Sequence, residues 1–98
     1  MFFKLHKSYR NVVAICDTEL LGKTFEEGKS YLDIKESFYK GEELDKIEIK
    51  KRIDFYSKED ATFNIVGKES IKVALEMGII SEEGIMNAQG IPFALVLM

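Results

Sequence analysis

The stretch Asn11-Val12-Val13-Ala14-Ile15-Cys16 decides the fold of this chain. It is almost entirely apolar and rich in β-branched side chains, without the alternation that is typical of a strand with one solvated face. We therefore expect a central strand that is covered on both faces. Upstream, residues 2–7 alternate apolar and polar side chains, so they predict a half-buried strand, and the short connection through Tyr9 and Arg10 predicts a hairpin.

Downstream, the pattern predicts alternating strands and helices. We expect one helical turn over residues 17–22, capped by Asp17, and a charged connection over residues 35–44. Further strands are expected over residues 29–34, 61–66, 84–88 and 93–97, and helices from the N-cap Asp45 to about residue 56 and over residues 68–77, the second closed by Gly78. This order predicts the α+β class: a two-layer α/β sandwich with a mixed or mainly antiparallel sheet and two helices. No linker or repeat is present, so residues 1–98 are expected to form a single α/β domain.

The inventory of reactive side chains is short, with one His, one Cys and one Pro among 98 residues. It excludes a Cys/His zinc module and a disulfide scaffold, so no metal and no cofactor is expected. Seventeen acidic against fourteen basic residues give a net charge of −3, which argues against strong nonspecific binding of nucleic acid. The longest apolar run, residues 91–98, is far shorter than the roughly 20 residues that span a bilayer. No membrane contact and a cytoplasmic location are therefore expected.

His6 and Cys16 are the only imidazole and thiol of the chain. A two-residue hairpin loop would place His6 opposite Val13, on the same face as Asp17, and would place Cys16 on the other face; a three-residue loop would reverse this. A carboxylate beside an imidazole orients it and raises its basicity, so His6 and Asp17 are the candidates for catalysis, although a surface ion pair gives the same pattern. Cys16 ends an apolar run, and we expect it to be buried and slow to react.

Two glycine motifs are similar to anion-binding sites. Gly22-Lys23-Thr24 resembles the end of a phosphate-binding loop, but Asp17 stands where that loop needs a glycine, so we expect a plain turn. Gly67-Lys68-Glu69-Ser70 begins the second helix, where free N–H groups beside Lys68 can bind a phosphate or a carboxylate. In the alternative, which we favour, Gly67 turns the chain and Asn64 caps a loop.

Several blocks of the sequence match a known family pattern. The block Cys16-Asp17-Thr18-Glu19-Leu20-Leu21-Gly22-Lys23 is distinctive, and shorter blocks follow it in order at residues 32–34, 38–41, 64–67, 74–80 and 90–92. Together they resemble the archaeal family known as domain of unknown function 424. The resemblance implies a two-layer α/β domain and a loose association with translation-related genes. Family members often carry a His after the last Pro, whereas here Phe93 follows Pro92, which favours a binding or structural role at that end of the sheet.

We therefore expect a non-enzymatic binding or accessory module, associated with translation or RNA, that contacts a protein or RNA partner. The residues expected to bind are glycines and polar side chains near the predicted turns: His6, Asp17, Glu19, Gly22, Lys23, Asn64, Gly67 and Lys68. One alternative is a small hydrolase or transferase that uses His6 and Asp17. Another is a structural homodimer joined through the apolar C-terminal strand, which must pair in the sheet or with a second copy.

Overall fold

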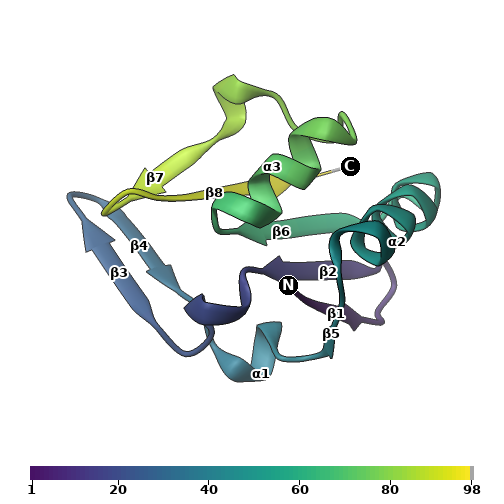
Figure 1. Cartoon of the computed structure of the whole chain (residues 1–98), viewed down its shortest axis with the longest axis horizontal. Helices are drawn as coiled ribbons and strands as arrows, with labels where there is room; N and C mark the ends of the chain where they lie inside the picture. Colours follow the sequence, from purple (N-terminus) through teal and green to yellow (C-terminus); the bar gives the residue numbers. More distant parts are fainter. Residues whose placement is uncertain (98) are drawn as a thin grey trace.

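The computed structural model describes residues 1–97, and Figure 1 shows their arrangement. The elements follow in the order β1 (Phe2–His6), β2 (Val12–Cys16), the 3₁₀ turn η1 (Thr18–Leu20), β3 (Thr24–Glu27), β4 (Ser30–Asp33), α1 (Glu36–Tyr39), β5 (Glu42–Glu43), α2 (Lys46–Lys58), β6 (Thr62–Val66), α3 (Lys68–Glu76), the 3₁₀ turn η2 (Glu82–Gly84), β7 (Met86–Ala88) and β8 (Ile91–Val96). This is an α+β fold with a mixed sheet, as the sequence predicts.

The main sheet has six strands in the order β5-β1-β2-β6-β8-β7. Only β2 and β6 run parallel among the described strands; the other neighbours in this sheet are antiparallel. The strand β2 lies inside the sheet, and its residues from Val13 to Cys16 are all buried, which confirms the prediction of a central strand covered on both faces.

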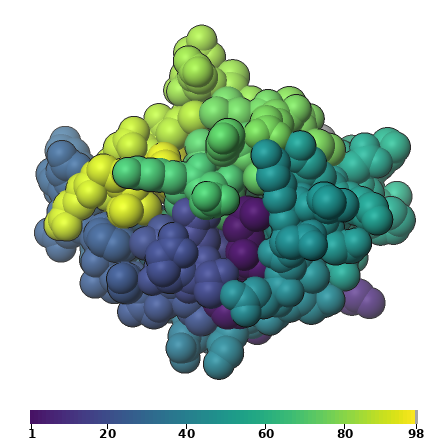
Figure 2. Space-filling model, in the orientation of Figure 1, coloured from purple at the N-terminus to yellow at the C-terminus, as the bar shows by residue number. Residues whose placement is uncertain are grey.

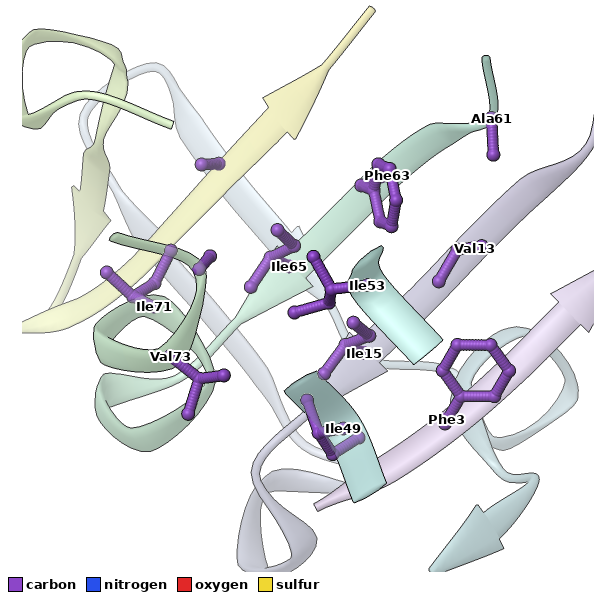
Figure 3. Packing of buried hydrophobic residues seen from close by; sticks show 12 residues of the cluster. Phe3, Val13, Ile15, Ile49, Ile53, Ala61, Phe63, Ile65, Ile71 and Val73 are labelled. Atoms are coloured by element: carbon purple, nitrogen blue, oxygen red, sulfur yellow. The ribbon is translucent and has the colours of Figure 1, made fainter. Parts of the chain in front are cut away.

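Helices α2 and α3 cover one face of the sheet, and Figure 3 shows the core between these helices and the sheet. Odd-numbered strand residues supply the sheet side of this core: Phe3, Val13, Ile15, Phe63 and Ile65. The helices supply Ile49, Ile53, Ile71 and Val73. The opposite face carries a second core, in which Ala14, Cys16 and Val66 pack against Leu32, Ile34 and Tyr39. Because both faces of β2 are covered, its sequence does not alternate.

The two long helices begin and end as their sequences predict. The Asp45 carboxylate accepts a hydrogen bond from the Glu48 N–H at 2.9 Å, so it caps α2, which runs two residues beyond the expected end. After α3, Gly78 adopts a positive φ of 72°, and the N–H of Ile79 reaches back to the Ala74 carbonyl at 3.3 Å. This left-handed C-cap turns the following isoleucines onto the core.

The stretch 35–44 corrects the expectation of a plain charged connection, because it forms α1 and the short strand β5. Phe38 and Tyr39 stand among charged residues, and their rings pack onto the second face of the sheet. A second difference concerns β4, which pairs with the unexpected strand β3 in a separate two-stranded sheet. These short elements are fixed by the burial of a few aromatic side chains in the folded chain. The helix and strand propensities of the local sequence do not predict that burial.

The N-terminal hairpin has the second of the two registers that the sequence leaves open. His6 pairs with Val12 and Phe2 pairs with Cys16, and residues 7–11 connect the strands. This register puts His6 and Cys16 on one face and Asp17 on the other, as the three-residue-loop alternative implies, so the pairing of His6 with Val13 that a two-residue loop would give does not occur.

The C-terminal strands also begin elsewhere than expected. Gln89 and Gly90 form a two-residue turn with φ values of 50° and 78°, as a tight hairpin requires, so β8 already begins at Ile91 and β7 only at Met86. Their pairing places β8 between β6 and β7.

Candidate functional site

The carboxyl ends of the parallel strands β2 and β6 meet beside the start of α3, and Asp17 links them. Asp17 is 4% exposed. Oδ1 accepts hydrogen bonds from the N–H and the hydroxyl of Ser70 at 2.8 and 2.7 Å, and Oδ2 accepts one from the Glu69 N–H at 3.1 Å. Asp17 therefore caps α3, 52 residues later in the chain, and not the adjacent turn η1, where its side chain makes no capping bond.

Gly67 makes this cap possible. It stands at the N-cap position of α3 with φ 108° and ψ 155°, a conformation that belongs almost exclusively to glycine. A Cβ atom there would lie 2.3–2.6 Å from the carboxylate atoms of Asp17. The chain's own carboxylate already binds the N–H groups of Glu69 and Ser70, so the favoured alternative holds for Gly67, which turns the chain, whereas Asn64 lies within β6 and caps no loop.

Two hollows flank Asp17, each of about 360 Å³. One lies between η1, the start of α2 and the start of α3, and Figure 2 shows the N-terminal residues, in purple, at its floor. The other is lined by Glu19, Leu20, Lys68, Glu69 and Ile91. The structure thus brings Asp17, Glu19, Gly67 and Lys68 together, with Glu69 as an addition that the sequence did not suggest. The corner is acidic, and both Asp17 oxygens are used internally.

His6 lies far from this corner. It faces Val12, whereas Asp17 follows Cys16, so the two are separated by roughly 16 Å along the strand. Its Nε2 donates a hydrogen bond to the Phe38 carbonyl at 2.8 Å, and its ring stacks on that of Phe38 with centroids 4.6 Å apart. The pairing of His6 with Asp17 is therefore wrong, and His6 instead holds α1 against β1.

Cys16 is completely buried, as expected. Burial, and secondarily the negative charge of Asp17, raise the pKa of its thiol to about 12. The reactive thiolate is therefore scarce at neutral pH, and Cys16 serves as a small core residue. Burial also raises the pKa of the neighbouring Tyr39 hydroxyl to about 12.

Gly22 and Lys23 form the plain turn that the sequence predicts. Gly22 has a φ of 84°, its N–H donates to the Ile34 carbonyl at 2.7 Å, and the Ile34 N–H donates to the Lys23 carbonyl at 3.0 Å. Their main chains therefore anchor the end of β4, and both residues are exposed to solvent.

Asn64 lies apart from all of these residues, in a groove on the second face of the sheet. This groove, of about 250 Å³, is lined by Tyr31, Leu32, Asp33, Tyr39, Asn64, Ile65, Val66, Met86, Phe93, Ala94 and Leu95. Large apolar side chains at its rim are open to solvent: Tyr31 is 62% exposed, Met86 46% and Leu95 49%. The hairpin β3–β4 and α1 cover only part of this face, so Asn64 keeps a half-open position.

Two polar groups in the groove have no partner among residues 1–97. Asn64 and Tyr39 both line the groove, and neither the Asn64 amide nor the Tyr39 hydroxyl makes a hydrogen bond to the described part of the chain. Tyr39 is only 6% exposed, yet its hydroxyl keeps contact with solvent. Both side chains therefore keep free hydrogen-bonding capacity.

The sequence alone does not reveal the groove, because its residues come from β4, α1, β6, β7 and β8. The one local signal was Phe93, the aromatic residue after Pro92.

Within residues 1–97, no helix is long and apolar enough to cross a membrane.

Comparison with known proteins gives a family and a fold. The family model described as "Protein of unknown function (DUF424)" matches residues 6–98. A crystal structure of an uncharacterized conserved protein from Methanopyrus kandleri is similar, with a TM-score of 0.82 and 24% sequence identity over 98% of this chain and 90% of that chain. No curated protein matches. The identity is low, so this structural likeness shows the fold alone, whereas the family model spans nearly the whole sequence. The chain thus belongs to the DUF424 family of proteins of unknown function.

Proposed function

We propose that this protein is a non-enzymatic binding module and that the groove around Asn64 is its binding surface. The observation that carries the proposal is the groove itself: large apolar side chains stand exposed at its rim, and two polar groups without a protein partner lie inside. An exposed apolar patch with a few convergent polar groups is typical of a recognition site.

The positions of the reactive side chains support binding over catalysis. His6 bonds to a carbonyl and stacks on Phe38, Cys16 is buried with a raised pKa, and Asp17 caps a helix. Each candidate for acid–base or nucleophilic chemistry thus has a structural task. A hydrolase built on His6 and Asp17 would need the two side chains within hydrogen-bond reach, and they lie at opposite ends of β2.

The chemistry of the groove favours a protein segment as its partner. Asp33 is the one charged residue among its lining residues, and Lys35 approaches the Asp33 carboxylate at 3.9 Å. A nucleic acid needs basic side chains to neutralise its phosphates, and this chain has a net charge of −3. The family resemblance implies a role associated with translation or RNA. In this proposal the protein takes that role as an accessory factor that binds another protein.

The test compares a groove variant with a matched surface variant. Leu95→Lys places a charge at the groove rim, and Ile47→Lys makes the same change at a 67% exposed position on α2. Each protein is immobilised and incubated with an archaeal lysate, and bound protein and RNA are quantified. We expect proteins that wild type and Ile47→Lys retain equally and that Leu95→Lys loses at least tenfold. Equal retention by all three, or retention of RNA alone, would contradict the proposal.

A further inference from the structure

The strand β8 is paired unequally on its two sides. Its ladder with β6 covers Phe93 to Val96, whereas its ladder with β7 covers only Ile91 to Phe93. Among residues 1–97, no strand therefore pairs with the outer side of Ala94–Leu95–Val96. This side is the open edge referred to below.

The main chain of Leu95 faces the open edge. The Pro92 carbonyl accepts a hydrogen bond from the Gly67 N–H at 2.8 Å, so residue 92 directs its polar main-chain groups toward β6. These directions alternate along a strand, and Leu95 stands three residues later, so its N–H and C=O point the opposite way. Leu95 also pairs with Asn64, which places its side chain on the face that carries the groove.

The open edge lacks the protection that the opposite edge of the sheet has. At the opposite edge, β5 is two residues long and consists of Glu42 and Glu43, both exposed. The open edge has the sequence Ala-Leu-Val, with Leu97 next to it, and Leu97 is 72% exposed. Proteins protect sheet edges with charges, prolines or short strands, and an apolar edge without them is a template for a further strand.

We propose that the open edge of β8 receives an extended segment of a partner protein as an added strand, and that an apolar side chain of this segment lies in the groove. The inference rests on the proposed function and adds the class of partner. Main-chain bonds to Leu95 provide affinity, and the groove selects the side chain, as in other cases of strand addition. The Asn64 amide bonds to a polar group next to that side chain.

The groove distinguishes this partner from a second copy and from RNA. A second copy paired through β8 with Leu95 opposite Leu95 would bring an apolar side chain, which offers Asn64 no hydrogen bond. RNA has no alternating N–H and C=O groups that match a strand edge. An extended peptide segment supplies both the main-chain ladder and a side chain of chosen size.

Peptides selected from a random display library provide the probe. Heptapeptides are selected on the immobilised wild-type protein, and the best one is synthesised. We expect apolar residues at alternate positions, and hydrogen exchange of the Leu95 amide that is at least tenfold slower in the complex. N-methylation of the peptide residue that pairs with Leu95 should weaken binding at least tenfold, and N-methylation of the residues next to it should have little effect.

Two variants at position 95 separate the contribution of the main-chain N–H to binding from that of the side chain. Leu95→Pro removes the outward N–H without removing a bond to β6, and Leu95→Ala keeps the N–H. We expect Leu95→Pro to bind at least tenfold more weakly than Leu95→Ala, with thermal unfolding confirming that both are folded. The N-methylation series decides the question even if Leu95→Pro does not fold.

The outcomes separate this inference from the proposed function. A peptide that shifts the NMR signals of Asn64 and Phe93 without protecting the Leu95 amide would overturn strand addition and leave the groove as a binding surface. Failure to select any peptide would overturn strand addition, as would a dimer in sedimentation that Leu95→Pro abolishes. Selection of peptides that affect neither edge nor groove would overturn both proposals.

Discussion

Asp17 shows how one carboxylate organises two distant parts of the chain. Three hydrogen bonds from Glu69 and Ser70 end on it, and it is almost completely buried. Gly67 and Asp17 depend on each other, because only a residue without a side chain leaves room for the carboxylate. Polar groups buried in this way are costly to leave without a partner.

Asp17→Ala should lower the free energy of unfolding by about 2–4 kcal/mol, because the helix loses its cap and buried N–H groups lose their acceptor. Asp17→Asn keeps one acceptor oxygen and should fall between wild type and Ala. Urea denaturation followed by circular dichroism measures both. The exposed neighbour provides the control, since Glu19→Ala should change stability by less than about 0.5 kcal/mol. Equal losses for Asp17→Ala and Glu19→Ala would show that the cap contributes nothing.

Gly67→Ala and Gly22→Ala separate backbone strain from steric conflict. Both glycines have positive φ, but a Cβ at Gly22 meets no atom within 4 Å, whereas one at Gly67 meets the Asp17 carboxylate. We expect a loss of about 1–2 kcal/mol for Gly22→Ala and more than about 3 kcal/mol for Gly67→Ala in the same urea experiment. If the two variants are equally stable, the carboxylate moves away freely and the contact is unimportant.

The helices α2 and α3 are joined by ion pairs as well as by their core residues. The Glu76 carboxylate on α3 accepts a hydrogen bond from Lys46 at 3.2 Å and forms an ion pair with Lys50 at 2.8 Å. Both lysines are on α2. These two hydrogen bonds hold the pKa of the Glu76 carboxyl below its usual value. A carboxyl whose pKa is lowered by folding stabilises the fold above its unfolded pKa and loses this effect as the pH falls.

Glu76→Gln should therefore reduce stability at neutral pH and low salt. The difference from wild type should vanish as the pH falls through the pKa of Glu76, because the wild-type side chain is then neutral too. It should also shrink in 1 M salt, since screening at that concentration acts within about 3 Å. Thermal unfolding at several pH values measures both effects. As a control, Glu43→Gln changes an exposed carboxylate without an ion pair among residues 1–97. A difference that persists at acid pH would assign the effect to packing.

The elements that sequence patterns predicted are those with long apolar runs, such as β2, or clear caps, such as Asp45 for α2 and Gly78 after α3. Of the missed elements α1, β3 and β5, the first two depend on isolated aromatic residues that become apolar anchors only in the folded chain. The hairpin register depends on the loop conformation, which composition does not encode. The groove was missed for the same reason, since no local pattern connects Tyr31, Met86 and Leu95.

At the scale of the whole molecule, the two faces of the sheet differ. Helices close one face with a core of aliphatic and aromatic side chains (Figure 3), whereas a hairpin and one helical turn close only part of the other. The second core contains two ionisable groups that folding keeps neutral, Cys16 and Tyr39. This face should therefore respond first to alkali.

Stability should fall as the pH rises from 9 to 12. The pKa of Cys16 rises from 9.0 to about 12 and that of Tyr39 from 10.0 to about 12, so the unfolded chain loses these protons first. The contribution is complete below pH 9; above pH 9 Cys16, and above pH 10 Tyr39 as well, lowers the free energy of unfolding by about 1.4 kcal/mol per pH unit until the pH reaches the folded pKa of about 12. Cys16→Ala and Tyr39→Phe should each make the decline shallower in denaturation measured across this range. An unchanged slope in both variants would show that neither group is responsible.

The parallel pairing of β2 with β6 also has a consequence for how the chain is made. Each residue of β2 pairs with one about fifty positions later, and β8 must follow before the sheet is complete. At about 5–20 residues per second, the most apolar strand waits roughly 3–10 s on the ribosome with only its hairpin neighbour beside it. The nascent chain is therefore most prone to aggregation early, and factors that shield emerging polypeptides should matter more for this small protein than its size suggests.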